Sequence, residues 1–202
     1  NGTFLLDKLV NLKESGLDKL NISLDTLDRL KYKSITGADK LTEVLQSIEK
    51  AKSLGFSPIK INTVVMKGVN DDEILDMVEF AIERDLNIRF IEFMPFSSNS
   101  WNDDNYISAT EIKKMVEQKF SLIELNSDKS EVAKSYSIKN RKRTVSLISS
   151  ISNHFCGDCN RLRITADGNL KLCLFSSKDG EISLRNLMRT NNLSDEQIAD
   201  VI

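Results

Sequence analysis

All three cysteines of this 202-residue chain lie in one segment. Cys156 and Cys159 form a C-x2-C pair, and Cys173 follows after thirteen intervening residues. Two thiolates at the shorter spacing can bind one metal centre across a tight turn, and Gly157 gives the backbone the freedom to make that turn. The spacing therefore predicts a metal site with sulfur ligands.

A hairpin turn is predicted at Asp167 and Gly168, between two short strands, and it would bring Cys173 back beside the C-x2-C pair. Three sulfur ligands that meet at one point suit an iron–sulfur cluster or zinc, because both bind soft thiolates. Three unrelated buried cysteines are the alternative, since cysteine is often a small core residue. The C-x2-C spacing favours the metal site.

Two arginines follow the second cysteine directly. Arg161 and Arg163 alternate along the predicted strand, so both side chains leave the same face. Paired guanidinium groups beside a metal centre would bind an anion, and their forked donors suit phosphate. A solvated basic face is the alternative. His154 stands two residues before Cys156 and is a candidate fourth ligand, although a surface histidine is the favoured interpretation.

The segment from Phe155 to Gly168, with Leu172 to Phe175, resembles the second cluster site of the MoaA family of radical S-adenosylmethionine GTP 3′,8-cyclases. The resemblance continues upstream over nearly the whole chain. It implies that Cys156, Cys159 and Cys173 bind a second 4Fe–4S cluster whose open iron holds the guanine of GTP. It also implies that Arg161 and Arg163 hold the nucleotide.

The same resemblance implies a lyase of molybdenum cofactor (molybdopterin) biosynthesis. S-adenosylmethionine would supply a 5′-deoxyadenosyl radical that removes hydrogen from C3′ of GTP, and the C3′ radical would attack C8 of guanine. The product would be (8S)-3′,8-cyclo-7,8-dihydroguanosine 5′-triphosphate, passed to cyclic pyranopterin monophosphate synthase. The family's first cluster motif, C-x3-C-x2-C, does not occur in these residues. We therefore expect a fragment that is inactive alone.

The first half of the chain reads as a run of strand–helix units, which indicates an α/β fold with a parallel sheet. Helices are predicted over residues 5–15, 36–54 and 71–86, and strands over 20–25, 59–66 and 88–94. Polar side chains stand at or near the carboxyl ends of the strands, where barrels of this kind gather their chemistry: Ser23, Asp25, Asn62 and Glu92. Capping of a loop is the alternative for Ser23 and Asp25.

The resemblance makes this half the C-terminal part of an incomplete (βα)6 TIM-type barrel, residues 1–96. A smaller α+β cluster-binding region would follow at 97–202. Within the barrel it implies that Ser23 and Met94 contact S-adenosylmethionine and that Lys60 reaches the GTP phosphates. The role of Arg89 stays open, because a regular strand would turn it away from Met94.

The second half predicts a helix over 108–120, where Ser108 and Glu111 form a capping box. Short antiparallel strands are predicted over 122–125, 135–138 and 143–148, a helix over 182–189, and a last helix capped by Ser194. The basic run from Arg141 to Arg143 is interpreted as a charged hairpin turn rather than a ligand site.

Composition narrows the class of protein. The net charge is −2, which gives no basic field for nucleic acid, and no apolar run is long enough to span a membrane. An odd number of cysteines with one tight pair favours a metal site in a reducing cytoplasm over a disulfide framework. An incomplete barrel would expose strand edges, so we expect self-association, for instance as a homodimer.

Two other functions stay open. A zinc-stabilised binding module on an α/β scaffold would use His154 and the three cysteines as a closed Cys3His site. Another radical enzyme with an auxiliary cluster is the second alternative, and Arg161 and Arg163 favour the GTP-using family over it.

Overall fold

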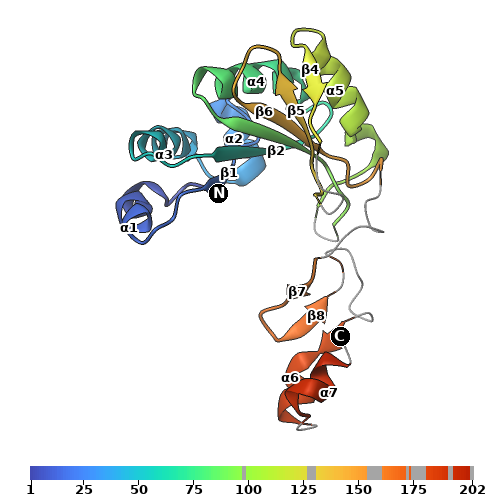
Figure 1. The fold of residues 1–202 in the computed structure, drawn as a ribbon. Coiled ribbons are helices and arrows are strands. Elements are labelled where there is room, and N and C mark those ends of the chain that lie inside the picture. Colours follow the sequence, from blue (N-terminus) through green and yellow to red (C-terminus); the bar gives the residue numbers. More distant parts are fainter. Residues whose placement is uncertain are drawn as a thin grey trace. The chain divides into compact units, whose positions relative to one another are not determined.

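A computed structural model describes residues 1–96, 99–126, 131–153, 161–171, 173, 181–190 and 193–200 (Figure 1). The chain divides into two compact units, Asn1–Gly157 and Asp158–Ile202.

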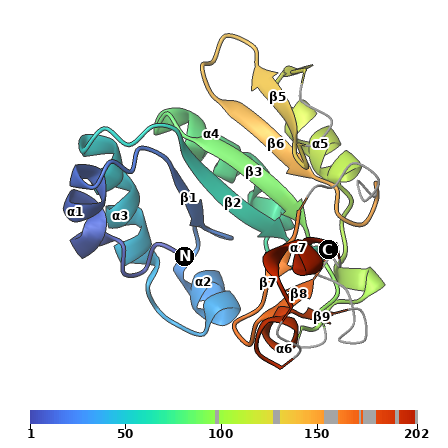
Figure 2. The same cartoon turned by 60° about the horizontal axis from the view of Figure 1, so that its bottom comes forward.

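The first unit is built on a six-stranded sheet with the order β1-β2-β3-β6-β5-β4. Strands β1, β2, β3 and β6 run parallel (Figure 2), whereas β5 pairs antiparallel with β6, and β4 pairs antiparallel with β5. The strands are β1 (Leu20–Ser23), β2 (Ile59–Val65), β3 (Asn87–Glu92), β4 (Leu122–Glu124), β5 (Lys134–Ile138) and β6 (Thr144–Ile148).

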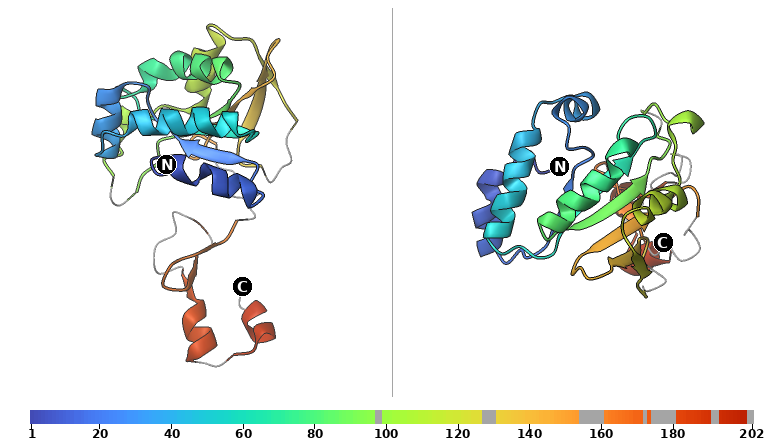
Figure 3. Two further views of the ribbon diagram at one scale, coloured as in Figure 1. Left: turned by 90° about the vertical axis from the view of Figure 1, so that its left-hand side faces the viewer. Right: turned by 90° about the horizontal axis from the view of Figure 1, so that it is seen from above.

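Helices cover one face of this sheet, where they bury its aliphatic side chains (Figure 3). The α-helices are α1 (Leu9–Glu14), α2 (Arg29–Thr36), α3 (Leu41–Ser53), α4 (Ile74–Glu83) and α5 (Ala109–Glu117). Three short 3-10 helices are η1 (Leu6–Lys8), η2 (Asp71–Glu73) and η3 (Asp103–Asn105). The core follows from alternation: Ile59, Ile61 and Val65 are buried, whereas Lys60 and Asn62 between them are only partly buried.

The predicted α/β fold with a parallel sheet is confirmed, and each strand predicted in the first half is present within two residues. The helix expected from residue 36 is wrong at its start. Asp28 caps an unpredicted helix, α2, by accepting from the amides of Leu30 and Lys31. Gly37 ends that helix at a φ of 73°, and α3 begins only at Leu41.

Strand β6 pairs in parallel with β3, in the register Arg89↔Ser146. The prediction of an antiparallel group was therefore right for β4, β5 and β6 among themselves but missed this central pairing. The sheet continues across the boundary that was predicted between residues 96 and 97, because β3 precedes that boundary and β6 follows it.

Two local predictions in the second half are confirmed. The Ser108 hydroxyl and the Glu111 carboxylate form the predicted capping box at the start of α5. The run from Arg141 to Arg143 lies at the turn between β5 and β6, as predicted. Arg143 also forms a two-pronged ion pair with Asp85, at 2.9 and 2.7 Å, which fastens that turn to the start of β3.

The second unit contains a small antiparallel sheet, β7-β8-β9. Its elements are β7 (Arg163–Ile164), β8 (Asn169–Lys171), β9 (Ile182–Ser183), α6 (Leu184–Arg189) and α7 (Asp195–Ala199). The turn predicted at Asp167 and Gly168 is confirmed, with Gly168 at a φ of 83°. Ser194 caps α7 as predicted. Ile182 and Ser183 form a strand instead of the first helical residues.

Among the described residues, no helix is both long and apolar enough to cross a lipid bilayer.

Candidate functional site

The sheet of the first unit has one polar face, opposite the face that the helices cover. On this face, five neighbouring strands each place one polar residue directly beside the polar residue of the next strand. Residues paired in register point to the same side of a sheet. We call this line of residues the polar row, and it consists of Ser23, Asn62, Arg89, Ser146 and Ser135. The hydroxyls of Ser135 and Ser146 lie 3.0 Å apart, which shows directly that their side chains share this face.

Asn62 stands in the middle of the polar row. Its Oδ1 atom is buried and has no hydrogen-bond partner among the described residues. A buried amide oxygen without a partner costs free energy, so such an atom is typical of a site that a ligand or water completes. Lys60 points to the same face two residues earlier, and no described carboxylate lies within ion-pair distance of it.

The role of Arg89 could not be predicted, because a regular strand would separate its side chain from Met94. The strand ends at Glu92, so strict alternation does not extend to Met94. Arg89 pairs in register with Asn62 and therefore lies on the polar face beside it. The structure thus places Lys60, Asn62 and Arg89 on one face.

The carboxylate of Asp25 closes the end of the β1–β2 pair by accepting a hydrogen bond from the Val64 amide at 2.8 Å. Burial raises the pKa of Asp25, and the Val64 hydrogen bond opposes that rise. The loop-capping alternative therefore holds for this residue. Ser23 is exposed on the polar face, and no described residue hydrogen-bonds to its hydroxyl.

Asn70 takes the N-cap position before η2, but its side chain makes no capping hydrogen bond there. Its amide group donates to the carbonyls of Asp25 and Val64 and accepts from the Met66 amide. The side chain is thus used to join the two strand ends. Glu73, also buried, accepts from the Thr26 hydroxyl and the Leu27 amide, and it holds the loop after β1.

Glu92 was predicted among the residues that gather chemistry at the strand ends. Instead it is fully buried on the helix-covered side of β3, where its oxygens accept from the amides of Ala109, Ile151 and Ser152. These bonds occupy both carboxylate oxygens. Glu92 therefore belongs to the packing between β3 and the helices and does not face the polar row. The alternation of β3 explains the error, since Glu92 shares its parity with Ile88 and Phe90.

Met94 lies just beyond β3 and is partly buried. Its carbonyl accepts from the Asn99 side chain at 2.8 Å, and the neighbouring Phe93 carbonyl accepts from the Trp101 indole at 2.9 Å. The polar segment that carries Asn99 and Trp101 is therefore held against the end of β3. Trp101 also contacts Tyr106, with ring centroids 6.4 Å apart.

In the second unit, Arg161 and Arg163 are both exposed, and no described carboxylate pairs with either. Arg163 pairs with Lys171, so Arg161 and Cys173 each lie two residues beyond this last pair, at the open end of the hairpin. Cys173 is exposed there. His154, Cys156 and Cys159 lie outside the described residues, and among the described ones no group of His, Cys, Asp or Glu could hold a metal ion.

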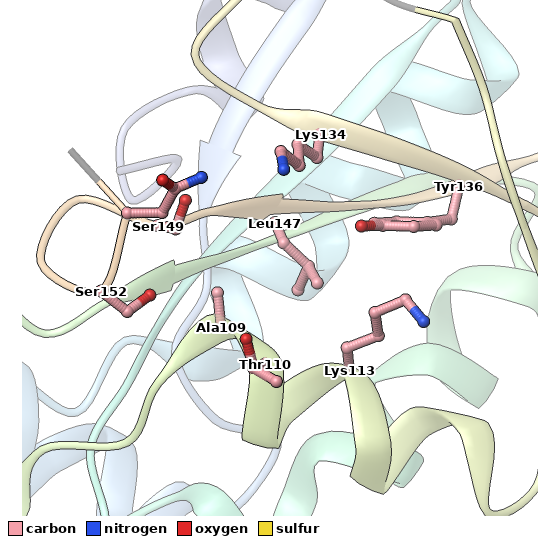
Figure 4. Close-up of a pocket in the computed structure, with 9 residues that line it drawn as sticks. Ala109, Thr110, Lys113, Lys134, Tyr136, Leu147, Ser149 and Ser152 are labelled. Carbon is pink, nitrogen blue, oxygen red and sulfur yellow. The ribbon is translucent and has the colours of Figure 1, made fainter. Parts of the chain in front are cut away.

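A separate cavity of about 240 Å³ lies between the start of α5 and strands β5 and β6 (Figure 4). Its walls carry Lys134, Tyr136, Leu147 and Ser152 among others. It opens on the helix-covered side, because Leu147 and Tyr136 belong to the core there. The cavity therefore does not belong to the polar face.

Sequence reasoning missed the continuity of the polar row. It singled out Ser23 and Asn62, but Ser135 and Ser146 lie in strands that were treated as a separate group. The pairing of β6 with β3 is what brings them into line. Alternation of polar residues in 143–148 was the available signal.

The comparisons with known proteins bear on both halves of the chain. Residues 86–202 match the family model Molybdenum Cofactor Synthesis C. The chain belongs to that family. Residues 1–81 match the model of the Radical SAM superfamily, so the two models together cover almost every residue.

Curated relatives match along the whole length of this family member. The chain is 44% identical to the GTP 3′,8-cyclase, mitochondrial, of Arabidopsis thaliana, over all of this chain and 51% of that protein. It is 40% identical to the GTP 3′,8-cyclase of Thermodesulfovibrio yellowstonii, covering 62% of it, and 42% identical to human molybdenum cofactor biosynthesis protein 1, covering 31%. The chain thus spans between 31% and 62% of the length of these relatives. The resemblance to the MoaA family is confirmed.

A crystal structure of Streptococcus suis SuiB resembles this family member with a TM-score of 0.55. The match covers 77% of this chain and 38% of that chain, at 14% sequence identity. At this identity the likeness concerns the fold alone.

Proposed function

We propose that the whole protein is a radical S-adenosylmethionine GTP 3′,8-cyclase, the enzyme of the first step of molybdenum cofactor biosynthesis. One observation carries the proposal: an open polar sheet face with Lys60 and the buried, unpartnered Asn62 oxygen, in a chain that matches named cyclases along its full length. Such a face offers cationic and amide groups to a phosphate-bearing nucleotide.

Residues 1–96 would be the C-terminal part of an incomplete (βα)6 barrel, with the polar face of their strands as the barrel interior. The parallel pairing of β1, β2 and β3, with helices on one face only, supports this interpretation. A barrel region over residues 1–96 and a cluster-binding region over 97–202 stay part of the proposal. The match to the first family model ends at residue 81 and the match to the second begins at residue 86, whereas the two compact units divide after residue 157.

Ser23 and Met94 would contact S-adenosylmethionine. Both stand at the carboxyl end of a parallel strand, β1 or β3, and the Ser23 hydroxyl is exposed there. The carbonyl of Met94 keeps a second lone pair beside the one that Asn99 uses, so it can accept from a ligand as well. Substitution of Ser23 by alanine should affect S-adenosylmethionine binding more than GTP binding.

Lys60, Arg161 and Arg163 would bind GTP. Lys60 reaches the polar face as a mobile point charge, whereas the two arginines present forked donors that suit phosphate oxygens. Arg89 lies on the same face as Lys60, and a contact of Arg89 with the phosphates is consistent with that position.

Cys156, Cys159 and Cys173 would hold a 4Fe–4S cluster, and the described part of the site fits this group. Cys173 is exposed at the open end of the hairpin, two residues beyond the last register pair, and cysteine sulfur is the usual protein ligand of iron–sulfur clusters. With three protein ligands, one iron would stay open to bind the guanine of GTP. A first 4Fe–4S cluster would activate S-adenosylmethionine and supply the radical chemistry. This chain's residues would hold GTP in line for that chemistry and exclude water.

The remaining elements of the proposal concern partners and location. The product would pass to cyclic pyranopterin monophosphate synthase, and the protein would act in the cytoplasm as a homodimer. The open edge of β1 supports self-association, because β1 pairs only with β2 among the described strands.

The experiment is an anaerobic incubation of the whole protein with GTP, S-adenosylmethionine and a reductant. We expect 5′-deoxyadenosine and a cyclised guanosine triphosphate to form together, measured by mass spectrometry. Formation of 5′-deoxyadenosine without consumption of GTP would indicate another radical enzyme. Absence of both products from a protein that holds zinc would favour the Cys3His binding module.

A further inference from the structure

Glu92 is a charged side chain with no solvent contact at all. A buried carboxylate is costly unless hydrogen bonds compensate for the lost hydration. Here four donors do so: the amides of Ala109, Ile151 and Ser152 at 2.7, 2.7 and 2.9 Å, and the Ser152 hydroxyl at 2.5 Å. Such a complete donor set fixes the carboxylate in one position.

These donors belong to two separate parts of the chain that meet at Glu92. Ala109 is the first residue of α5, whereas Ile151 and Ser152 follow β6. Tyr106 lies beside the same carboxylate. Its burial and the negative charge of Glu92 both raise the pKa of the Tyr106 hydroxyl. Ala109 and Ser152 also face each other across one end of the cavity described above, which shows how closely the two segments approach (Figure 4).

The segment that Glu92 holds leads directly to the predicted cluster ligands. Ser152 stands four residues before Cys156 along the chain. Three hydrogen bonds to Glu92 fix Ile151 and Ser152 relative to β3. Four residues span a short distance even when extended, so the segment that carries the predicted ligands starts from a fixed point at Ser152.

We propose that Glu92 is a positioning residue for the second cluster: it anchors the start of the cysteine segment to the end of β3. The proposal rests on the proposed function, because it requires a cluster on Cys156, Cys159 and Cys173. It goes beyond that function by assigning a role to a residue that contacts neither the cluster nor a substrate. Substitution should loosen the cysteine segment without removing any ligand.

The test substitution is Glu92→Gln, which keeps the size of the side chain. Its amide nitrogen cannot accept from the backbone amides, so at least one donor loses its partner. Loss of a residue that orients metal ligands commonly weakens metal binding by roughly 10–100-fold. We therefore expect the second cluster of the whole protein to be lost to an iron chelator at least about tenfold faster, with an altered electron paramagnetic resonance spectrum.

Glu73→Gln is the matched control. Glu73 is also a buried carboxylate that accepts from a hydroxyl and a backbone amide, but it holds the loop after β1. Its loss should lower the melting temperature while leaving the second cluster's spectrum and retention unchanged. Ser152→Ala removes one donor of Glu92 without changing the carboxylate, and it should give a weaker form of the Glu92→Gln result.

The outcomes separate the two proposals. If the wild-type protein contains no second cluster, the proposed function fails. If the wild-type cluster is present and both Glu92→Gln and Ser152→Ala retain it with the wild-type spectrum, the positioning role of Glu92 is wrong. Equal loss of the cluster in Glu73→Gln would also overturn it, because the effect would then be general destabilisation. If Glu92→Gln does not fold, Ser152→Ala against Glu73→Gln decides.

Discussion

The two units of this chain differ in how they are stabilised. The sheet unit buries aliphatic residues from five of its strands against five helices. In the hairpin unit, Leu170 is the single buried residue among those described, and Leu162, Ile164 and Met188 are 57%, 65% and 57% exposed. The sheet unit can draw its stability from a core of its own. The hairpin unit needs another source, and a cluster bound by three cysteines would provide it, because metal binding couples to folding.

The largest effect should follow from removal of a cluster ligand. In Cys173→Ser we expect loss of the second cluster and of GTP binding, because serine replaces a soft ligand at the open end of the hairpin. Hydrogen exchange should show lost protection in residues 163–171 and unchanged protection in β2. Equal loss in both segments would break the distinction between the units.

Phe90→Ala should destabilise the sheet unit strongly. Phe90 is 1% exposed beneath the helices, and truncation of a buried phenylalanine costs about 3–5 kcal/mol. Chemical denaturation of the whole protein should show this loss in the transition that reports on the sheet. An exposed counterpart, Phe4→Ala, should change stability little, because Phe4 is 75% exposed. Similar losses in both variants would mean that burial is not what stabilises this unit.

Arg161→Ala and Arg163→Ala should each weaken GTP binding by about ten- to a hundredfold, since a hydrogen bond to a charged group contributes roughly 1.5–3 kcal/mol. Arginine to lysine should recover only part of this affinity, because the charge remains but the fork is lost. GTP binding and iron content are measured together. Lost iron in both variants would assign the arginines to the cluster segment instead of the substrate.

Lys60→Ala should weaken GTP binding by about tenfold and leave the cluster intact, because a single point charge is lost from the polar face. Equilibrium dialysis on the whole protein measures the affinity. Lys50→Ala on the exposed side of α3 is the control. Equal affinities in the wild type and in both variants would remove Lys60 from the site.

The smallest effect concerns Asp25. Burial raises the pKa of Asp25 in the folded state above the ordinary value of 3.8. The protonated carboxyl therefore stabilises the fold fully below pH 3.8. This stabilisation is lost as the pH rises through the folded-state pKa. Asp25→Asn should keep the bond to the Val64 amide and show no such loss. The difference in melting temperature between variant and wild type should grow from pH 3.8 upward. A constant difference across that range would contradict the assignment.

The parallel strands and their spacing could be predicted because alternation and β-branched residues mark them locally. The hairpin at Gly168 and the caps at Ser108 and Ser194 were likewise local signals. The pairing of β6 with β3 could not be predicted, because it joins residues almost sixty positions apart and no local pattern records it.

The candidate site shows the same limit. Lys60 and Asn62 could be placed on one face by counting residues along a strand, but the position of Glu92 required knowledge of what packs on the other face. Its carboxylate is used by the backbone of two distant segments. Sequence shows where a polar residue stands along a strand, whereas only the pairing and packing show which groups it meets.

Metal analysis of the anaerobically purified whole protein tests the cluster assignment most directly. Iron, acid-labile sulfide and zinc are measured in the wild type and in Cys173→Ser, with Mössbauer spectra of both. We predict iron and sulfide in equal amounts, with one 4Fe–4S component that disappears in Cys173→Ser. Stoichiometric zinc without iron in the wild type, or an unchanged iron content in Cys173→Ser, would contradict a second cluster held by this chain.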